Sequence, residues 1–194
     1  MIAALFVDPK GPYSSFCGLD LWDEKRDARK YSGPYPVIAH PPCNRWGKLA
    51  PVNYKRWGTP IGEDGGCFES ALNSVRTYGG VLEHPANTIA WKTFGLVKPT
   101  EPGWMKVSDN EWVGEVWQSA YGHPATKRTW LLYVGDSPKE FSLERIKGKY
   151  QIGGGVNTGF NKKPRLAQSK THLTPPLFAK YLIDLVKKDW INHE

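Results

Sequence analysis

The stretch PVIAHPPCNRW, residues 36–46, decides the fold that this sequence predicts. It opens with a short apolar run, Val37 to Ala39, of the kind that forms a buried parallel strand. Because proline can neither continue a β-ladder nor lie inside a regular helix, Pro41 and Pro42 make the chain leave the sheet rigidly. Cys43 is therefore expected just past the carboxyl end of a strand, where open α/β sheets bind their ligands.

On this stiffened loop Cys43 is a candidate nucleophile. The nearby Arg45 supplies a cation, which lowers the pKa of a thiol, and Trp46 supplies an aromatic ring. We predict that Pro42, Asn44, Arg45 and Trp46 contact the substrate. The alternative is that Cys43 is a small buried hydrophobe, as most free cysteines are.

The composition indicates one basic domain. A chain of 194 residues can bury a full core, and its net charge of +7 favours an anionic partner. Nucleic acid is the first candidate for that partner and the phosphates of a small ligand the second, although a basic surface is also often a solubility feature. The odd number of three cysteines, without a framework spacing, argues against a disulfide-stapled secreted domain.

The expected location is the cytoplasm of a bacterium or of a phage-infected cell. No run approaches the roughly 18 apolar residues of a transmembrane helix. The apolar start, Ile2 to Val7, is too short for a signal peptide. We therefore expect no membrane association, and we infer no obligate protein partner.

Two further apolar runs have the same plan as the strand before Cys43. Residues 2–7 form a run that ends at Asp8 and Pro9, and Val81-Leu82 runs into Glu83, His84 and Pro85. A helix predicted over residues 63–78 and a short charged helix over residues 22–31 would connect the three strands. Glu83 then reaches the same sheet edge as Cys43, although pairing of Glu83 with a surface lysine is an equal alternative.

The rest of the chain predicts a closing β-hairpin and a last helix. Residues 112–120 and 129–134 read as antiparallel strands, and a helix begins near residue 174. The basic and aromatic residues of 44–62 are expected on a loop that suits phosphate contacts and base stacking, or on an ordinary exposed loop. Residues 137–168 form an irregular basic insertion that could act as a small recognition element.

Four segments, taken in order, resemble DNA cytosine-5 methyltransferases. Pro41-Pro42-Cys43 is similar to the family's catalytic Pro-Cys loop, and Val81-Leu82-Glu83 is similar to its Glu-Asn-Val strand end, with His84-Pro85 in place of Asn-Val. The segment from Tyr121 through Gly122, His123 and Pro124 to Lys127-Arg128 resembles the family's Tyr-Gly-x-Pro-Gln-x-Arg segment. Residues 174–180, TPPLFAK, resemble the start of its last helix.

This resemblance implies a Rossmann-like methyltransferase fold, a mostly parallel sheet closed by an antiparallel hairpin. It implies that Cys43 attacks C6 of a flipped-out cytosine in DNA, which makes C5 nucleophilic. Glu83 would hold the base edge at N3, and Lys127 or Arg128 would take the place of the family's arginine. His84 and His123 fall on matched segments and are candidate substrate contacts.

The methyl-donor half of the family looks reduced in this chain. The resemblance implies S-adenosylmethionine as cofactor, but the glycine-rich loop after the first strand is absent. Asp8, Pro9 and Gly11 stand there instead, and Asp20 is a candidate for the ribose, or a helix cap. These four are the predicted cofactor contacts, and no metal site is expected, since His40 and Cys43 make only half a zinc pattern.

Three functions stay open at the level of sequence. The first is an enzyme that modifies C5 of a pyrimidine in DNA, with methyl transfer as the default reaction. The second is the same covalent chemistry on a pyrimidine nucleotide with a different donor. The third is a non-catalytic nucleic-acid-binding protein on a decayed methyltransferase scaffold.

Overall fold

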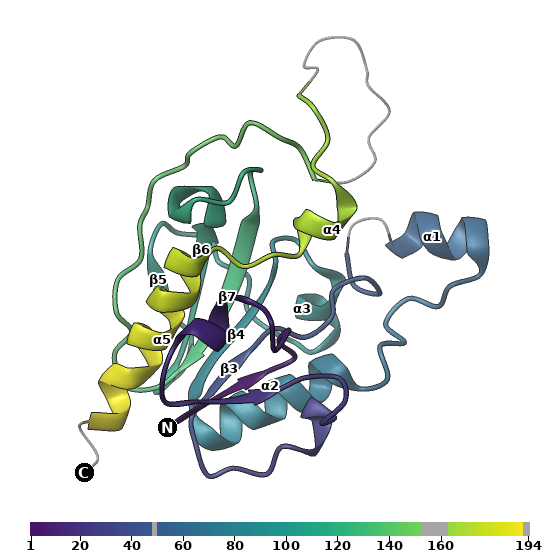
Figure 1. Ribbon diagram of the computed structural model, residues 1–194. Coiled ribbons are helices and arrows are strands. Elements are labelled where there is room, and N and C mark those ends of the chain that lie inside the picture. Colours follow the sequence, from purple (N-terminus) through teal and green to yellow (C-terminus); the bar gives the residue numbers. More distant parts are fainter. Residues whose placement is uncertain (48–49, 153–162, 192–194) are drawn as a thin grey trace.

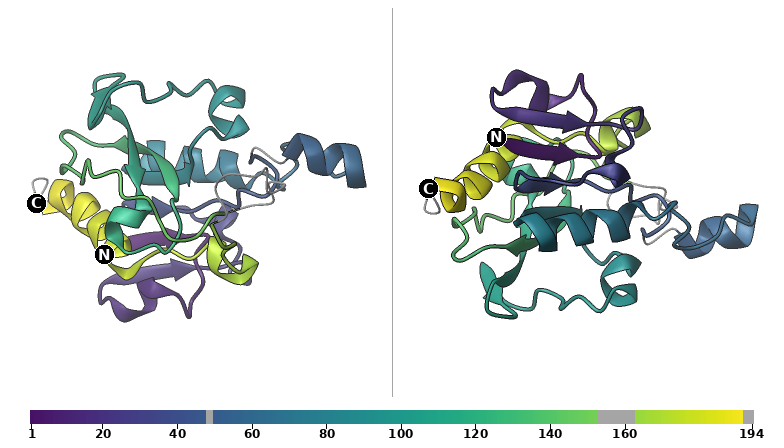
Figure 2. Two further views of the ribbon diagram at one scale, coloured as in Figure 1. Left: turned by 90° about the horizontal axis from the view of Figure 1, so that it is seen from above. Right: turned by 90° about the horizontal axis from the view of Figure 1, so that it is seen from below.

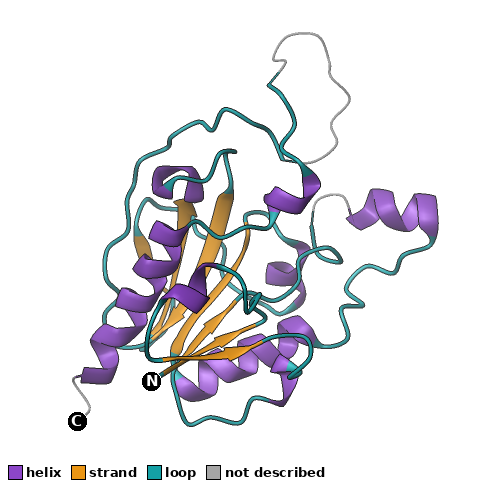
Figure 3. Ribbon diagram, viewed as in Figure 1, coloured by secondary structure: helices purple, strands orange, loops and turns teal. Residues whose placement is uncertain are grey.

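A seven-stranded mixed sheet forms the centre of the molecule, with the strand order β2-β1-β3-β4-β7-β6-β5 (Figures 1 and 3). The computed structural model describes residues 1–47, 50–152 and 163–191. The strands are β1 (Ile2–Leu5), β2 (Leu19–Trp22), β3 (Val37–Ala39), β4 (Gly80–Pro85), β5 (Trp104–Lys106), β6 (Glu111–Trp117) and β7 (Arg128–Val134).

Helices and 3-10 turns connect the strands. The helices are α1 (Ala50–Trp57), α2 (Cys67–Tyr78), α3 (Ile89–Thr93), α4 (Gln168–Thr171) and α5 (Pro176–Ile191), and the 3-10 turns are η1 (Pro12–Ser15), η2 (Ala28–Lys30) and η3 (Gln118–Tyr121). None of the helices in the described part of the chain has the length and apolar character needed to cross a membrane.

The sheet has a parallel half and an antiparallel half. β2, β1, β3 and β4 are parallel, whereas β7, β6 and β5 continue the sheet antiparallel. The α/β class and the closing β6–β7 hairpin that the sequence predicts are therefore confirmed, but the sheet is mixed in equal parts rather than mostly parallel. β1 and β3 are buried throughout, as expected for apolar strands covered on both faces.

The two faces of the sheet are covered by different helices. Ala3, Leu5 and Leu82 pack with α2 on one face, and Ala4, Ile38 and Val81 pack with α5 on the other. Successive side chains of a strand point to opposite faces. Glu83 therefore lies on the α5 face with Val81, and His84 lies on the α2 face with Leu82.

A close backbone approach fixes β4 beside β3. Gly80, at φ +117°, begins β4, and a Cβ atom there would lie 2.0 Å from the carbonyl oxygen of Val37. No side chain fits at that distance, so a glycine is required for the two strands to pair. This pairing brings the exit of β4 next to the exit of β3.

Two local predictions were wrong, and one strand was missed. Residues 22–31 do not form a helix: β2 ends at Trp22, and Asp27, at φ +57°, caps the short η2 turn through the amide of Arg29. Short acidic side chains that bond to nearby amides favour turns over helix, which explains the difference. Within residues 44–62, predicted as a loop, the structure has helix α1, and β5 was not predicted.

The predicted insertion at residues 137–168 is described only in part, because residues 153–162 lie outside the described chain. Its described residues carry two isolated bridges, Ala125 with Tyr150 and Gln151 with Arg165. Gly148 passes so close to Ala125 that a Cβ atom would lie 2.3 Å from its carbonyl carbon. The first part of this segment is thus packed on the turn that precedes β7.

Candidate active site

A cavity of about 550 Å³ opens at the carboxyl ends of β1, β3 and β4. The strand order reverses between β1 and β3, since β2 lies on one side of β1 and β3 on the other. Ligands of open α/β sheets bind at such a reversal. The lining residues are 6–8 and 11–13 after β1, 40–43 after β3, 83 and 85–87 in β4 and its exit, 126–128 at the start of β7, and 152 and 171–174.

Two residues of the cavity wall have a backbone conformation that side chains rarely adopt. Phe6, directly after β1, has φ +59°, and Asn87, after β4, has φ +62°. A bulky residue such as phenylalanine in the left-handed region is strained, and strain of this kind gathers at functional sites. The strained position, Phe6, lies at the same edge of the sheet as the cavity.

Glu83 forms the buried floor of the cavity, with only 7% of its surface exposed. Its Oε1 accepts a hydrogen bond from Nε2 of Gln118 at 2.8 Å and one from the hydroxyl of Thr129 at 3.3 Å. Its Oε2 lies 3.0 Å from Nδ1 of His40. The carboxylate is therefore held by polar neighbours from three elements, and it does not form the surface ion pair that the sequence left open.

Glu83 is ionised at neutral pH. Burial would raise the pKa of this carboxyl, but the charge of Lys127 and the hydrogen bond from His40 outweigh it and lower the pKa to about 2. A carboxylate in a largely water-excluded site can accept hydrogen bonds from a ligand strongly. To act as an acid it must first receive a proton from a neighbour.

Cys43 lies at the cavity wall, and its residue as a whole is exposed to solvent. Partial desolvation of the sulfur and the negative charge of Glu83 raise the pKa of the thiol, while Lys127 acts in the opposite direction. The expectation that nearby cations lower this pKa is therefore wrong for the free protein. Arg45, the cation nearest in sequence, is not part of the cavity wall.

Of the two consecutive cations at the start of β7, Lys127 is the one whose charge acts on the site. The half-buried Lys127 lines the cavity and lowers the pKa of both Glu83 and Cys43. Arg128 also borders the cavity, but its guanidinium is bound by Glu115 through two hydrogen bonds of 2.9 and 2.7 Å. The structure thus separates the two cations that the sequence left as alternatives.

His40 and Tyr13 complete the site, and sequence reasoning missed their contribution. The hydroxyl of Tyr13 lies 2.7 Å from Nε2 of His40, whose Nδ1 faces Glu83. His40 was visible as the polar residue at the end of its strand, in the position that Glu83 has in the other one. Tyr13 gave no signal, because it comes from a loop whose path only the folded chain defines.

Several predicted substrate contacts lie away from the cavity. His84 is fully buried on the opposite face of the sheet against Phe68, with ring centroids 5.1 Å apart, and burial lowers its pKa to about 4. Trp46 is buried in the core, where its indole donates to Asp64. His123 is also buried outside the cavity.

The remaining predicted contacts divide between the cavity and its surroundings. Pro42 lines the cavity, whereas Asn44 and Arg45 follow it on the next turn and do not. Among the predicted cofactor residues, Asp8 and Gly11 line the cavity, and Pro9 and Asp20 do not.

The residues after β1 do not fit the S-adenosylmethionine site that the resemblance implies. The amide of Gly11 donates to the carbonyl of Asp8, and the carboxylate of Asp8 accepts from the amide of Lys10, so the loop bonds mainly to itself. Asp20 is engaged by Arg26 and by the indole of Trp22. No step that uses this cofactor is therefore assigned to these side chains.

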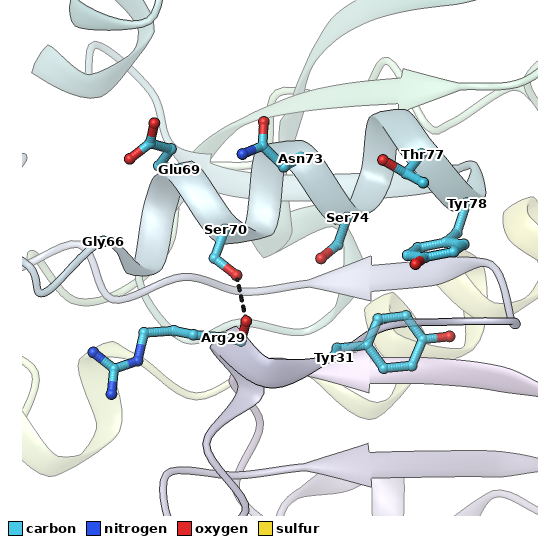
Figure 4. A pocket seen from close by; sticks show the side chains of 9 residues that line it. All are labelled: Arg29, Tyr31, Gly66, Glu69, Ser70, Asn73, Ser74, Thr77 and Tyr78. Carbon is cyan, nitrogen blue, oxygen red and sulfur yellow. Dashed lines mark hydrogen bonds between the residues drawn. The ribbon is translucent and has the colours of Figure 1, made fainter.

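A second cavity, of about 350 Å³, lies between α2 and η2 (Figure 4). Arg29, which borders it, is bound by Asp27 and by the carbonyl of Gly65, and the hydroxyl of Ser70 donates to the carbonyl of Arg29. None of the predicted site residues lies there. Among the described residues, no three His, Cys, Asp or Glu side chains gather as a metal site.

No family model matches the sequence, and no curated protein or solved structure matches it significantly. The resemblance to DNA cytosine-5 methyltransferases therefore stays a prediction from four short segments. Function must be inferred from the geometry of the cavity at β1, β3 and β4.

Proposed function

We propose that the protein is an enzyme that activates C5 of a pyrimidine by adding the Cys43 thiolate to C6. One observation supports this proposal above all: Cys43, Glu83 and Lys127 come from three separate segments and border one cavity at the sheet edge. Such an addition needs a nucleophile, a group that bonds to the ring at N3, and a cation that favours the thiolate.

The reaction divides into addition and release. The sulfur of Cys43 forms a bond to C6, the C5–C6 π electrons move into the ring, and N3 takes a proton from the Glu83 site. C5 is then nucleophilic and takes a proton from water, or another electrophile. Water takes the original C5 hydrogen as a proton, the electron pair of that bond re-forms the C5–C6 double bond as the thiolate leaves C6, and N3 returns its proton to Glu83.

Thiolate formation is disfavoured in the free protein, because desolvation and Glu83 raise the pKa of Cys43. Lys127 is the residue that favours the thiolate. A substrate edge that bonds to Glu83 would weaken the repulsion between the two negative groups. Substrate binding and thiolate formation are thus coupled through Glu83.

The proposed substrate is a pyrimidine within DNA, and helix α1 supports a polymer over a free nucleotide. α1 stands out from the body of the protein in every view (Figures 1 and 2). Trp57 is 68% and Tyr54 55% exposed, and Lys55 and Arg56 between them are exposed too. Exposed rings suit base stacking and the cations suit phosphates, and residues 44–62 contain no acidic side chain.

Hydrogen exchange at C5 tests the addition without any donor. We expect the protein to release tritium from C5 of cytosine in an oligonucleotide, and to form a covalent adduct with a 5-fluorocytosine oligonucleotide that mass spectrometry detects. Cys43→Ser is the matched variant and should do neither. If the wild-type protein neither releases tritium nor forms the adduct, or if Cys43→Ser forms as much adduct as wild type, the assignment of Cys43 as the nucleophile is wrong.

Methyl transfer, the default reaction that the resemblance implies, is tested separately by adding S-adenosylmethionine to the same oligonucleotide. A methylated product would supply the donor that the loop after β1 does not reveal. Exchange without methylation would favour a different electrophile or donor.

A second candidate, non-catalytic binding of nucleic acid, is favoured by the raised pKa of Cys43 together with the poor fit of the cofactor loop. It predicts salt-sensitive DNA binding with no exchange and no adduct. In both cases Trp57→Ala should weaken DNA binding by about 1–3 kcal/mol, the usual loss for one stacked base. Fluorescence anisotropy at several salt concentrations measures this, and an unchanged affinity would remove α1 from the interface.

A further inference from the structure

Three side chains that line the cavity, those of Tyr13, His40 and Glu83, contact one another in a row. The hydroxyl of Tyr13 lies 2.7 Å from Nε2 of His40, and Nδ1 of His40 lies 3.0 Å from Oε2 of Glu83. The three residues come from η1, the exit of β3 and the end of β4. Tyr13 is 2% exposed and Glu83 7%, so bulk water has little access to these two side chains.

The direction of the two hydrogen bonds of His40 follows from the protonation state of the Tyr13 hydroxyl. Burial, and then the charge of Glu83, raise the pKa of the Tyr13 hydroxyl well above its usual value, so it keeps its proton. In neutral His40 the hydroxyl therefore donates to Nε2, which leaves the ring proton on Nδ1, pointing at Glu83. In the resting protein this hydrogen bond favours the Nδ1–H tautomer.

The two oxygens of Glu83 have different surroundings. Oε1 already accepts from Gln118 and Thr129, whose side chains are fully buried. Oε2 has His40 as its described hydrogen-bond partner. A proton that reaches this carboxylate from the protein therefore has His40 as its direct donor.

We propose that His40, held by Tyr13, passes protons to and from Glu83 while the pyrimidine ring is activated. The inference rests on the proposed function and adds two residues to it. Both residues act through Glu83, so they are positioning residues in the sense that neither one contacts the reacting atoms of the ring.

The proton balance requires one extra proton on the His40–Glu83 pair. With that proton on His40, Nε2–H donates to the oxygen of Tyr13 and Nδ1–H faces Oε2. As the sulfur of Cys43 bonds to C6, the Nδ1 proton moves to Oε2, and from Glu83 this same proton passes to N3. His40 is left neutral with its hydrogen on Nε2, and the reverse transfers follow when the thiolate leaves.

The test uses the exchange of C5 tritium by the full-length protein on a cytosine oligonucleotide. His40→Gln keeps a hydrogen-bond donor for Glu83 but cannot carry a proton. We expect kcat for exchange to fall by about 10²–10⁴, the range for a lost proton-transfer group, while KM stays within roughly threefold. Tyr13→Phe should lower kcat by roughly tenfold, because one hydrogen bond to His40 is lost.

Chemical rescue separates proton transfer from a structural role. His40→Ala leaves space that imidazole can fill, and the rescued rate should depend on the pKa of substituted imidazoles of similar size. Tyr181→Phe is the matched tyrosine control, since this buried hydroxyl bonds to the carbonyl of Lys139 outside the cavity. Circular dichroism melting checks that each variant is folded.

The outcomes distinguish the relay from the proposed function. If wild type exchanges C5 tritium and folded His40→Gln does so at the same kcat, the relay is wrong and the function stands. A rescue by imidazoles that does not vary with their pKa would also overturn the relay. If wild type itself neither exchanges nor forms the fluorocytosine adduct, the proposed function fails first.

Discussion

Two carboxylates on the strands that flank β7, Glu83 in β4 and Glu115 in β6, differ in what holds them. Glu115 is bound directly by the guanidinium of Arg128 and by the indoles of Trp117 and Trp130. Glu83 is held by His40, Gln118 and Thr129, and its cation Lys127 acts from the cavity wall.

The different partners of the two carboxylates explain why only Glu83 is a candidate for reactive chemistry. A carboxylate in a two-point bond with arginine has its charge neutralised and its oxygens occupied, so it serves as a structural link. A carboxylate held by side-chain donors and a nearby cation keeps an oxygen face toward the cavity. Lys127 and Arg128 are adjacent in sequence but differ in role. Lys127 belongs to the candidate reactive centre, and Arg128 belongs to a structural ion pair with Glu115.

The largest difference between Glu83 and Glu115 is expected when each carboxylate is replaced by a neutral amide. We expect Glu83→Gln to lower the rate of C5 tritium exchange by about 10²–10⁴, as for the loss of a catalytic acid or base. Glu115→Gln should leave the rate within roughly threefold, since this residue does not border the cavity. Equal losses in the two variants would contradict the assignment.

Acid unfolding tests the low pKa of Glu83 directly. The pKa of Glu83 is lowered to about 2 in the folded protein, so its contribution to stability is present above its unfolded value, near 4.5, and is lost as pH falls toward 2. Glu83→Gln should flatten the pH dependence of the unfolding free energy between these values. Urea melts from pH 2.5 to 6 measure it, and an unchanged slope would argue against the low pKa.

Substitution of Lys127, the cation at the cavity wall, is expected to have a smaller effect. Lys127→Met removes the charge that favours the thiolate, so the pKa of Cys43 should rise further and alkylation of Cys43 at pH 8 should slow several-fold. Arg128→Met should slow it less, because Glu115 already neutralises that cation. Mass spectrometry of the labelled cysteine reports the rates, and the reverse order would exchange the roles of the two cations.

The smallest effect is expected for the structural pair itself. Arg128 is nearly half exposed, so its bond to Glu115 is screened by solvent. We expect Arg128→Met to cost at most about 1 kcal/mol of unfolding free energy. A much larger loss in a urea melt would show that the Glu115 cluster carries more of the fold than its exposure indicates.

The local pattern of the sequence predicted the frame of the site. Apolar runs ended by proline correctly placed the exits of β1, β3 and β4 at one edge, because strand propensity and proline geometry act over a few residues. The same reasoning brought Cys43 and Glu83 together, and the resemblance added Lys127 or Arg128 as alternatives. It failed for residues 22–31, where local side-chain bonds to amides overrode a helix-favouring composition.

The sequence by itself determined the α/β class, the strand exits and the candidate nucleophile with its acidic neighbour. Packing in three dimensions was needed to show that His84 lies on the opposite face from Glu83 and that Lys127 rather than Arg128 acts on the cavity. It also showed that Tyr13 contacts His40, which contacts Glu83. Propensities and turn signals depend on neighbours along the chain. Hydrogen bonds and charge shifts depend on distances in space between segments up to about a hundred residues apart, which packing alone sets.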